Sequence, residues 1–150
     1  MNMTTRQIEI LLIEDNPGDI VLTQEAFRES NLKTNMNVVG DGASAIEYLS
    51  HSGQYSGSAS PDLILLDLNL PKLSGREVLE LIKTHEHWKM IPVIMLTTSE
   101  SEHDVNDAYL RHVNCYITKP MAFDPFIEVI RKIEGFWLGL ARLPHSSSRN

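Results

Sequence analysis

The amino-acid sequence predicts an α/β protein with a doubly wound architecture, in which a five-stranded parallel sheet lies between two layers of helices. Two observations lead to this prediction. Short apolar runs alternate five times with segments that have apolar residues at helical spacing. The strongest of these runs are apolar at nearly every position, with Glu9 the one charged residue among them, and this is typical of strands buried on both faces. A chain of 150 residues is long enough for one domain of this kind.

Five segments are expected to be strands. Three are continuous runs rich in Ile, Leu and Val that stop abruptly at polar or turn residues, and two are weaker. In chain order the five are residues 8–13, 36–39, 63–66, 91–96 and 115–118. Their order along the chain, with a helical segment after each, favours parallel pairing with helices on both faces.

The helical segments are expected to begin near residues 18, 45, 74, 101 and 124. Ser74 and Glu77 have the spacing of a capping box, in which a serine and a glutamate satisfy backbone groups at a helix start. Ser101 begins a related pattern. Asp124 followed by Pro125 is expected to be an acidic N-cap with proline at the first helical position.

The chain is expected to hold one domain, at residues 8–143. The segments 1–7 and 144–150 are expected to be flexible, the Gly- and Ser-rich stretch 51–60 an inserted exposed loop, and 124–143 an extended last helix.

Composition narrows the class of function. Thirteen basic and twenty acidic residues give a formal net charge of −7, which argues against binding to nucleic acid or to an anionic membrane. Cys115 is a single cysteine and cannot form an internal disulfide. No apolar run reaches the ~18–20 residues that a membrane helix needs, and the first residues do not have the pattern of a signal peptide. A soluble, cytoplasmic protein is expected.

Polar side chains follow four of the expected strands. Glu14 and Asp15 follow the first, Asp67 the third, Thr97 the fourth and Lys119 the fifth. Carboxyl ends of parallel strands meet at one edge of the sheet, so these side chains are expected to share one crevice. Like charges ~4 Å apart repel by roughly 4 kcal/mol at an effective dielectric near 20, so such a cluster needs a cation. Each residue alone would more often be a turn or helix-cap residue, whereas the five together predict a Mg²⁺ site.

At this point the sequence resembles the receiver domain of two-component response regulators. The resemblance rests on four motifs, at residues 11–16, 65–75, 93–98 and 116–120. It implies a flavodoxin-like (βα)5 fold and a function as phosphoacceptor rather than as an enzyme with an external substrate.

The resemblance also implies a role for each residue of the cluster. Asp67 would be the phosphoacceptor, and Lys119 and Thr97 would stabilise the phosphoryl group. The ligands of Mg²⁺, or of Mn²⁺ in its place, would be Glu14, Asp15, Asp67 and the main-chain carbonyl of Asn69.

Three further residues match positions with a known role in the family. Tyr116 matches the aromatic switch position that turns inward on activation, and Thr97 would move with it. The bond between Lys119 and Pro120 is expected to be cis. Gly75 is expected to be a structural position.

Some segments resemble a narrower group, the small single-domain regulators that partner cyanobacterial phytochromes. These segments are residues 14–19, the loop before Pro61, residues 112–120 and residues 136–138. The narrower resemblance implies a stand-alone regulator, a phytochrome-type histidine kinase as phosphoryl donor, and a homodimer. The downstream protein cannot be identified from the sequence.

The expected last helix has more apolar residues than one packed face requires. We expect the surplus to bury against a partner, most simply a second copy of the chain. The candidate interface residues are Phe136, Trp137, Leu138 and Leu140.

Three alternative functions fit parts of this pattern. A Mg²⁺-dependent phosphatase with an aspartyl nucleophile needs a second acid two residues after Asp67, where this chain has Asn69. A flavodoxin needs a Ser/Thr/Gly-rich phosphate loop where this chain has acids. An inactive pseudo-receiver would act only by binding partners, and the intact set of five polar residues argues against it.

Overall fold

A computed structural model describes residues 7–30 and 32–144. The expectations for the two terminal segments therefore fall, except at Gln7 and Pro144, outside the described residues. Five parallel strands form one sheet in the order β2-β1-β3-β4-β5. Their bounds are β1 Ile8–Ile13, β2 Thr34–Val39, β3 Leu63–Leu66, β4 Val93–Thr97 and β5 Cys115–Thr118.

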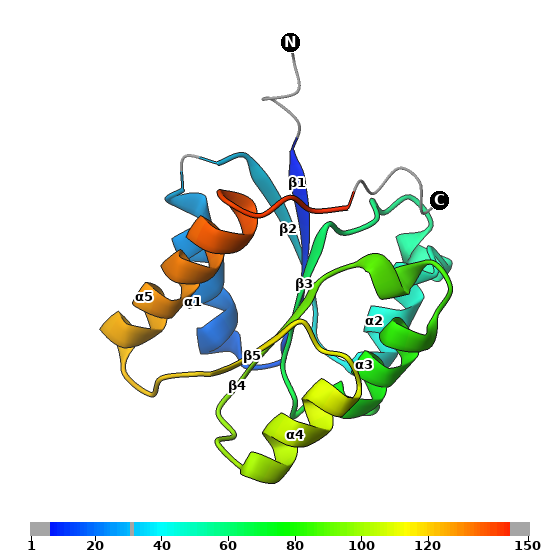
Figure 1. The fold of residues 1–150 in the computed structure, drawn as a ribbon. Coiled ribbons are helices and arrows are strands. Elements are labelled where there is room, and N and C mark those ends of the chain that lie inside the picture. Colours follow the sequence, from blue (N-terminus) through cyan, green and yellow to red (C-terminus); the bar gives the residue numbers. More distant parts are fainter. Residues whose placement is uncertain (1–6, 31, 145–150) are drawn as a thin grey trace.

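Helices cover both faces of the sheet (Figure 1). Helices α1 and α5 form one layer, and α2, α3 and α4 form the other. Their bounds are α1 Pro17–Arg28, α2 Gly42–Leu49, α3 Gly75–Thr84, α4 Glu102–Leu110 and α5 Phe123–Ile133. The predicted doubly wound architecture is confirmed.

Successive residues of each central strand pack on opposite layers, because side chains alternate along a strand. In β1, Leu11 and Ile13 belong to the core beneath α2, α3 and α4. Ile10 and Leu12 belong to the core beneath α1 and α5. All four are 3% exposed or less, which explains why the run is apolar without alternation.

Two predicted helix starts are confirmed. The hydroxyl of Ser74 accepts from the backbone N–H of Glu77, and the Glu77 carboxylate accepts from the backbone N–H of Ser74. The hydroxyl of Ser101 accepts from the N–H of Asp104. These bonds satisfy donors that would otherwise be unpaired at the start of α3 and α4.

Other predicted bounds were wrong. Strand β2 begins at Thr34, two residues before the expected start, and β4 begins at Val93 because Ile91 and Pro92 end the preceding turn. Helix α5 begins at Phe123 after Ala122, so Asp124 is not the N-cap. Asp124 instead lies in the first turn, where a negative charge still favours the positive end of the helix dipole.

The predicted last helix is not one regular α-helix. A π-helical turn, Glu134–Leu138, follows α5, with bonds from Gly139 N–H to the Glu134 carbonyl and from Ala141 N–H to the Phe136 carbonyl. The wider turn changes which side chains face the core. Leu138 is 9% exposed and packs in the core beneath α1 and α5.

The stretch 51–60 connects α2 to β3 and is largely exposed, with a 3-10 turn at Gly53–Tyr55. The ring of Tyr55 lies 5.4 Å from that of Tyr48, between centroids, which holds the loop against α2. Within the described residues, no helix combines the length and apolarity needed to cross a membrane.

Candidate functional site

The sheet continues for one residue beyond three of its strands, and this continuation places the polar side chains. Each residue directly after β1, β3 and β5 donates its backbone N–H to the neighbouring strand. The three bonds are Glu14 to the Val39 carbonyl at 3.0 Å, Asp67 to the Ile13 carbonyl at 3.0 Å and Lys119 to the Thr97 carbonyl at 2.6 Å.

Three carboxylates converge at this edge. Glu14, Asp15 and Asp67 each offer an oxygen, and these oxygens lie within 4.8 Å of one another. Glu14 and Asp67 are buried, whereas Asp15 is exposed. The structure thus brings together the acids that the sequence placed after separate strands.

The ammonium group of Lys119 lies among these carboxylates. It donates to Glu14 Oε1 at 2.7 Å and to Asp19 Oδ2 at 2.7 Å, and it lies 3.6 Å from Asp67 Oδ2. Only 5% of the Lys119 side chain is exposed. One positive charge therefore faces several negative charges. The net charge of the site stays negative, which favours the binding of a further cation.

Asp19 is a member of the site that sequence reasoning missed. It lies in the first turn of α1, where Asn16 caps the helix by accepting from the Asp19 N–H at 2.9 Å. Since α1 starts at the carboxyl end of β1, an acid in its first turn points to the same edge as Glu14. The position of Asp19 in the first turn of this helix was the feature of the sequence that could have identified it as a member of the site.

The buried charges shift two pKa values. Burial raises the pKa of Glu14 to about 7, and repulsion from Asp67 adds to this while the hydrogen bond from Lys119 opposes it. For Lys119, burial acts to lower the pKa, but the hydrogen bonds to Asp19 and Glu14 outweigh it and the pKa is raised. Lys119 is therefore a fixed positive charge at neutral pH.

The donor set fits a small divalent cation. Mg²⁺ prefers carboxylate oxygens and is usually held by one or two of them. Both Glu14 oxygens already accept hydrogen bonds, from Lys119 and from the Asn16 N–H at 3.1 Å. Asp15 and Asp67 are thus the carboxylates most free to bind a metal ion. Asn69 is exposed two residues after Asp67, and the role of its carbonyl stays a prediction.

Thr97, the last residue of β4, is fully buried at the same edge. Within the described part of the chain, its hydroxyl has no hydrogen-bond partner. A buried hydroxyl left unpaired costs about 1–3 kcal/mol, so this group is ready to bond an oxygen that enters the site.

Tyr116 stands in an inward position. Its ring packs against the core beneath α2, α3 and α4, and its hydroxyl donates to the Ser99 carbonyl at 2.9 Å. Its backbone N–H donates to the hydroxyl of Tyr109 on α4 at 3.1 Å. The movement of Tyr116 on activation stays a prediction.

One expectation about the site was wrong: the bond between Lys119 and Pro120 is trans. Even before proline the trans form is favoured by ~0.5–1 kcal/mol. The trans chain already gives Lys119 its backbone bond to Thr97 and its side-chain bonds to Glu14 and Asp19. Nothing in this geometry requires the less stable isomer.

The structural role of Gly75 has a clear geometric basis. A Cβ atom at this position would lie 2.1 Å from the carbonyl oxygen of Asp67 and 2.7 Å from the Leu68 Cα. The Gly75 N–H donates to the Leu68 carbonyl at 2.8 Å. The start of α3 thus packs directly on the backbone of the phosphoacceptor candidate, and only glycine permits this approach.

Comparison with known proteins agrees with this geometry. Residues 10–131 match the family model described as the response regulator receiver domain. The chain belongs to this family. The match includes β2 to β5 whole, most of β1 and most of α5, and it favours the receiver over the phosphatase and flavodoxin alternatives.

Individual members of this family are also similar to the chain. Response regulator Rcp1 from Synechocystis sp. is 45% identical over 135 residues, covering 90% of this chain and 92% of the relative. A solved structure described as the Mn²⁺-bound form of Rcp1 has a TM-score of 0.90 at 44% identity and covers 92% of this chain and 99% of the other. A structure of the phosphorylated cyanobacterial phytochrome response regulator RcpA has a TM-score of 0.91 at 46% identity and covers 93% and 100%.

The predicted resemblance to phytochrome response regulators is confirmed by these matches. A relative with another description is also similar. The probable methanogenesis regulatory protein FilR2 from Methanothrix harundinacea is 41% identical and covers 90% of this chain and 86% of the relative.

Proposed function

We propose that this response regulator accepts a phosphoryl group on Asp67 from the phosphohistidine of a histidine kinase. The observation that carries the proposal is the position of the Asp67 carboxylate, beside Glu14 and Asp15 and 3.6 Å from the Lys119 ammonium group. RcpA, a relative with 46% identity, has been solved as the phosphorylated protein, which supports the same chemistry here.

The transfer is an in-line displacement at phosphorus. A carboxylate oxygen of Asp67 forms the new bond, while the bond between phosphorus and the imidazole nitrogen of the kinase breaks and its electron pair stays on that nitrogen. Lys119 places a positive charge beside Asp67, and Glu14 and Asp19 fix its position. Asp15 and Asp67 would hold a divalent ion, which would supply further positive charge to the transferring oxygens.

The signal that follows is a change at the surface. An acyl phosphate on Asp67 adds strong acceptor oxygens beside the unpaired Thr97 hydroxyl. A bond from Thr97 to one of them fixes the carboxyl end of β4 and, with it, the loop that leads into α4. The chain acts on its own side chain and is not expected to turn over an external substrate.

The kinase that we propose as donor is of the phytochrome type. The support comes from Rcp1 and RcpA, since RcpA is described as a phytochrome response regulator. Phosphotransfer from a phytochrome histidine kinase, timed against kinases of other sensor classes, tests this point. Equal rates from all donors would contradict it. A cytoplasmic location stays a prediction.

We also propose a homodimer formed through the segment that follows α5, at residues 136–140. Phe136 is 51% exposed and Leu140 is 74% exposed, and Phe136 and Trp137 line an apolar groove between β5 and α5. Leu138 is withdrawn from the interface because it packs inside the protein's own core. Light scattering after size exclusion should show a dimer that Phe136→Asp dissociates, with Val21→Asp on α1, at a site 54% exposed, as the matched control.

The test of the proposed function uses acetyl phosphate as a small phosphoryl donor. With Mg²⁺ present, the chain should gain one phosphate that hydroxylamine removes, and Asp67→Asn should gain none. Continuous release of phosphate without stable labelling would indicate a phosphatase instead. No labelling of the folded wild-type chain would overturn the proposal.

A further inference from the structure

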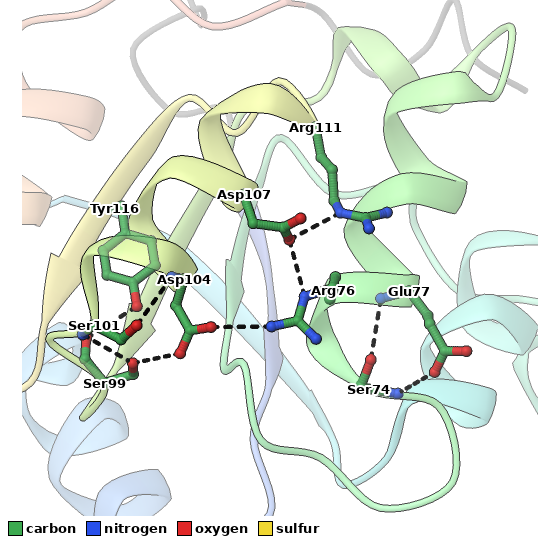
Figure 2. Close-up of polar contacts among 9 residues, drawn as sticks. All are labelled: Ser74, Arg76, Glu77, Ser99, Ser101, Asp104, Asp107, Arg111 and Tyr116. Carbon is green, nitrogen blue, oxygen red and sulfur yellow. Dashed lines mark hydrogen bonds and ion pairs between the residues drawn. The ribbon is translucent and has the colours of Figure 1, made fainter.

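A ladder of ion pairs joins α3 to α4 on the side of the sheet away from α1 and α5 (Figure 2). Its centre is Arg76, which bonds two acids on α4. The Arg76 Nη2 donates to Asp104 Oδ1 at 3.0 Å, and its Nε donates to Asp107 Oδ2 at 2.9 Å. Asp104 and Asp107 are three positions apart on the helix, so both face α3.

The ladder continues to the loop between β4 and α4. The hydroxyl of Ser99 donates to Asp104 Oδ2 at 2.6 Å, and the Ser99 carbonyl accepts from the Tyr116 hydroxyl at 2.9 Å. Figure 2 shows this path from Arg76 through Asp104 and Ser99 to the tyrosine ring. One side chain on α3 is thus connected to the switch residue on β5 through three consecutive hydrogen bonds.

We propose that Arg76 is a positioning residue for the switch: by holding Asp104, it fixes Ser99 so that the Ser99 carbonyl keeps Tyr116 in its inward position. This inference deepens the proposed function and rests on it for its signalling meaning. Arg76 sets the ratio of inward to outward Tyr116, and phosphorylation of Asp67 acts on the same loop through Thr97, two residues before Ser99.

The geometry favours Arg at this position. A planar guanidinium offers N–H groups in fixed, diverging directions and can bond two carboxylates at once, whereas the ammonium of Lys is a single point charge. The Asp104 side chain is 20% exposed and that of Arg76 is 37% exposed, so water screens the pair in part. The contact therefore contributes mainly by fixing the position of Asp104 and adds little to the stability of the fold.

The end of the ladder at Arg111 provides a matched control (Figure 2). Arg111, the C-cap of α4, donates to Asp107 on its own helix at 2.9 Å and to Glu80 on α3 at 3.0 Å, so its bond to Glu80 also joins α4 to α3. Among the residues that the structure describes, its bonds go to Asp107 and Glu80 and not to Asp104 or Ser99. A substitution of Arg111 therefore removes the same kind of interaction between the same two helices and leaves the path to Tyr116 intact.

The experiment follows Tyr116 directly. The full chain is labelled with 3-fluorotyrosine, and its ¹⁹F NMR signals are recorded without a phosphoryl donor, the Tyr116 signal being assigned with Tyr116→Phe. Arg76→Gln should lower the inward-to-outward ratio about tenfold, which corresponds to ~1.4 kcal/mol. Arg76→Lys should have an intermediate effect, and Arg111→Gln should leave the ratio within twofold of wild type.

Two further measurements separate this role from a general loss of stability. Ser99→Ala removes the hydroxyl link and keeps the carbonyl, and it should reproduce the Arg76→Gln spectrum even if Arg76→Gln folds poorly. Beryllofluoride with Mg²⁺, as a mimic of the phosphoryl group, should restore the inward signal in Arg76→Gln. Equal spectra for Arg76→Gln and Arg111→Gln, or a wild-type signal in Ser99→Ala, would overturn the inference. If beryllofluoride with Mg²⁺ left the Tyr116 signal of the wild type unchanged, that result would contradict the proposed function instead.

Discussion

The ammonium group of Lys119 lies 2.7 Å from the carboxylate of Glu14, although the two residues are 105 positions apart in the chain. The pair joins the carboxyl ends of β1 and β5, which are separated in the sheet by β3 and β4. It is almost fully buried, with 5% of the Lys119 side chain and 4% of the Glu14 side chain exposed. A buried lysine among acids holds the negative charges together, and its removal leaves them uncompensated.

We therefore expect Lys119→Met to lower the free energy of unfolding by about 3 kcal/mol without metal, because buried carboxylates lose their partner. Mg²⁺ should stabilise this variant more than it stabilises the wild type, since the cation replaces part of the lost charge. Urea unfolding with and without Mg²⁺ measures both effects. Lys72→Met, at an ion pair whose lysine is 68% exposed, is the control. An equal gain from Mg²⁺ in wild type and variant would contradict this account of the site.

The raised pKa of Glu14 predicts a pH dependence of stability. The pKa of this carboxyl is about 7 in the folded chain, against an ordinary value of 4.5. The folded state therefore binds more protons than the unfolded state in this window, and stability falls as the pH rises from about 4.5 to about 7, by on the order of 3 kcal/mol.

Glu14→Gln should remove that slope, because glutamine does not titrate. Glu25→Gln, at a side chain that is 53% exposed, should leave it unchanged. Urea unfolding at a series of pH values from 4.5 to 8, without metal, makes the comparison. A wild-type slope retained in Glu14→Gln would assign the titration to another group.

Because the Thr97 hydroxyl is buried and unpaired in the described structure, we expect its removal to affect signalling without lowering stability. Thr97→Val keeps the shape of the side chain and removes a buried hydroxyl that lacks a partner in the described structure. The variant should be as stable as the wild type or more stable by about 1 kcal/mol. It should still accept phosphate on Asp67 but lose the accompanying change in the Tyr116 signal. A clear loss of stability would show that the hydroxyl has a partner in solution.

Gly75 predicts a strong effect of a single methyl group. In Gly75→Ala the new Cβ would meet the Asp67 carbonyl at 2.1 Å, so the backbone of the phosphoacceptor or of α3 must shift. Overpacking of this kind costs about 1–3 kcal/mol, and phosphorylation of Asp67 should slow with it. Gly57→Ala, where nothing lies within 4 Å of the new atom, should change neither stability nor labelling rate.

The sequence predicted the parts of the fold that depend on local pattern. Residues 10–13 of β1 and Leu63–Leu66 are apolar because both faces are buried, and the polar residues after them lie at one edge because the strands are parallel. Both properties follow from residue order alone. The placement of Glu14 and Asp67 side by side was therefore predictable.

Other features depend on contacts between distant segments. The bond from Lys119 to Asp19 needs the true position of α1 against β5. The π-helical turn at Glu134–Leu138 turns Leu138 into the core, and the spacing of apolar residues does not predict such a turn. The ladder through Arg76 arises only when α3 lies beside α4, so a charge pattern on either helix alone does not reveal it.

The central claim is that Asp67 is the phosphoacceptor and depends on a divalent cation. The most direct measurement is peptide mapping by mass spectrometry after incubation with acetyl phosphate, once with Mg²⁺ and once with EDTA. The account predicts a single phosphate on the peptide that contains Asp67, present with Mg²⁺ and absent with EDTA. Phosphate on any other residue, or equal labelling of Asp67 in EDTA, would contradict it.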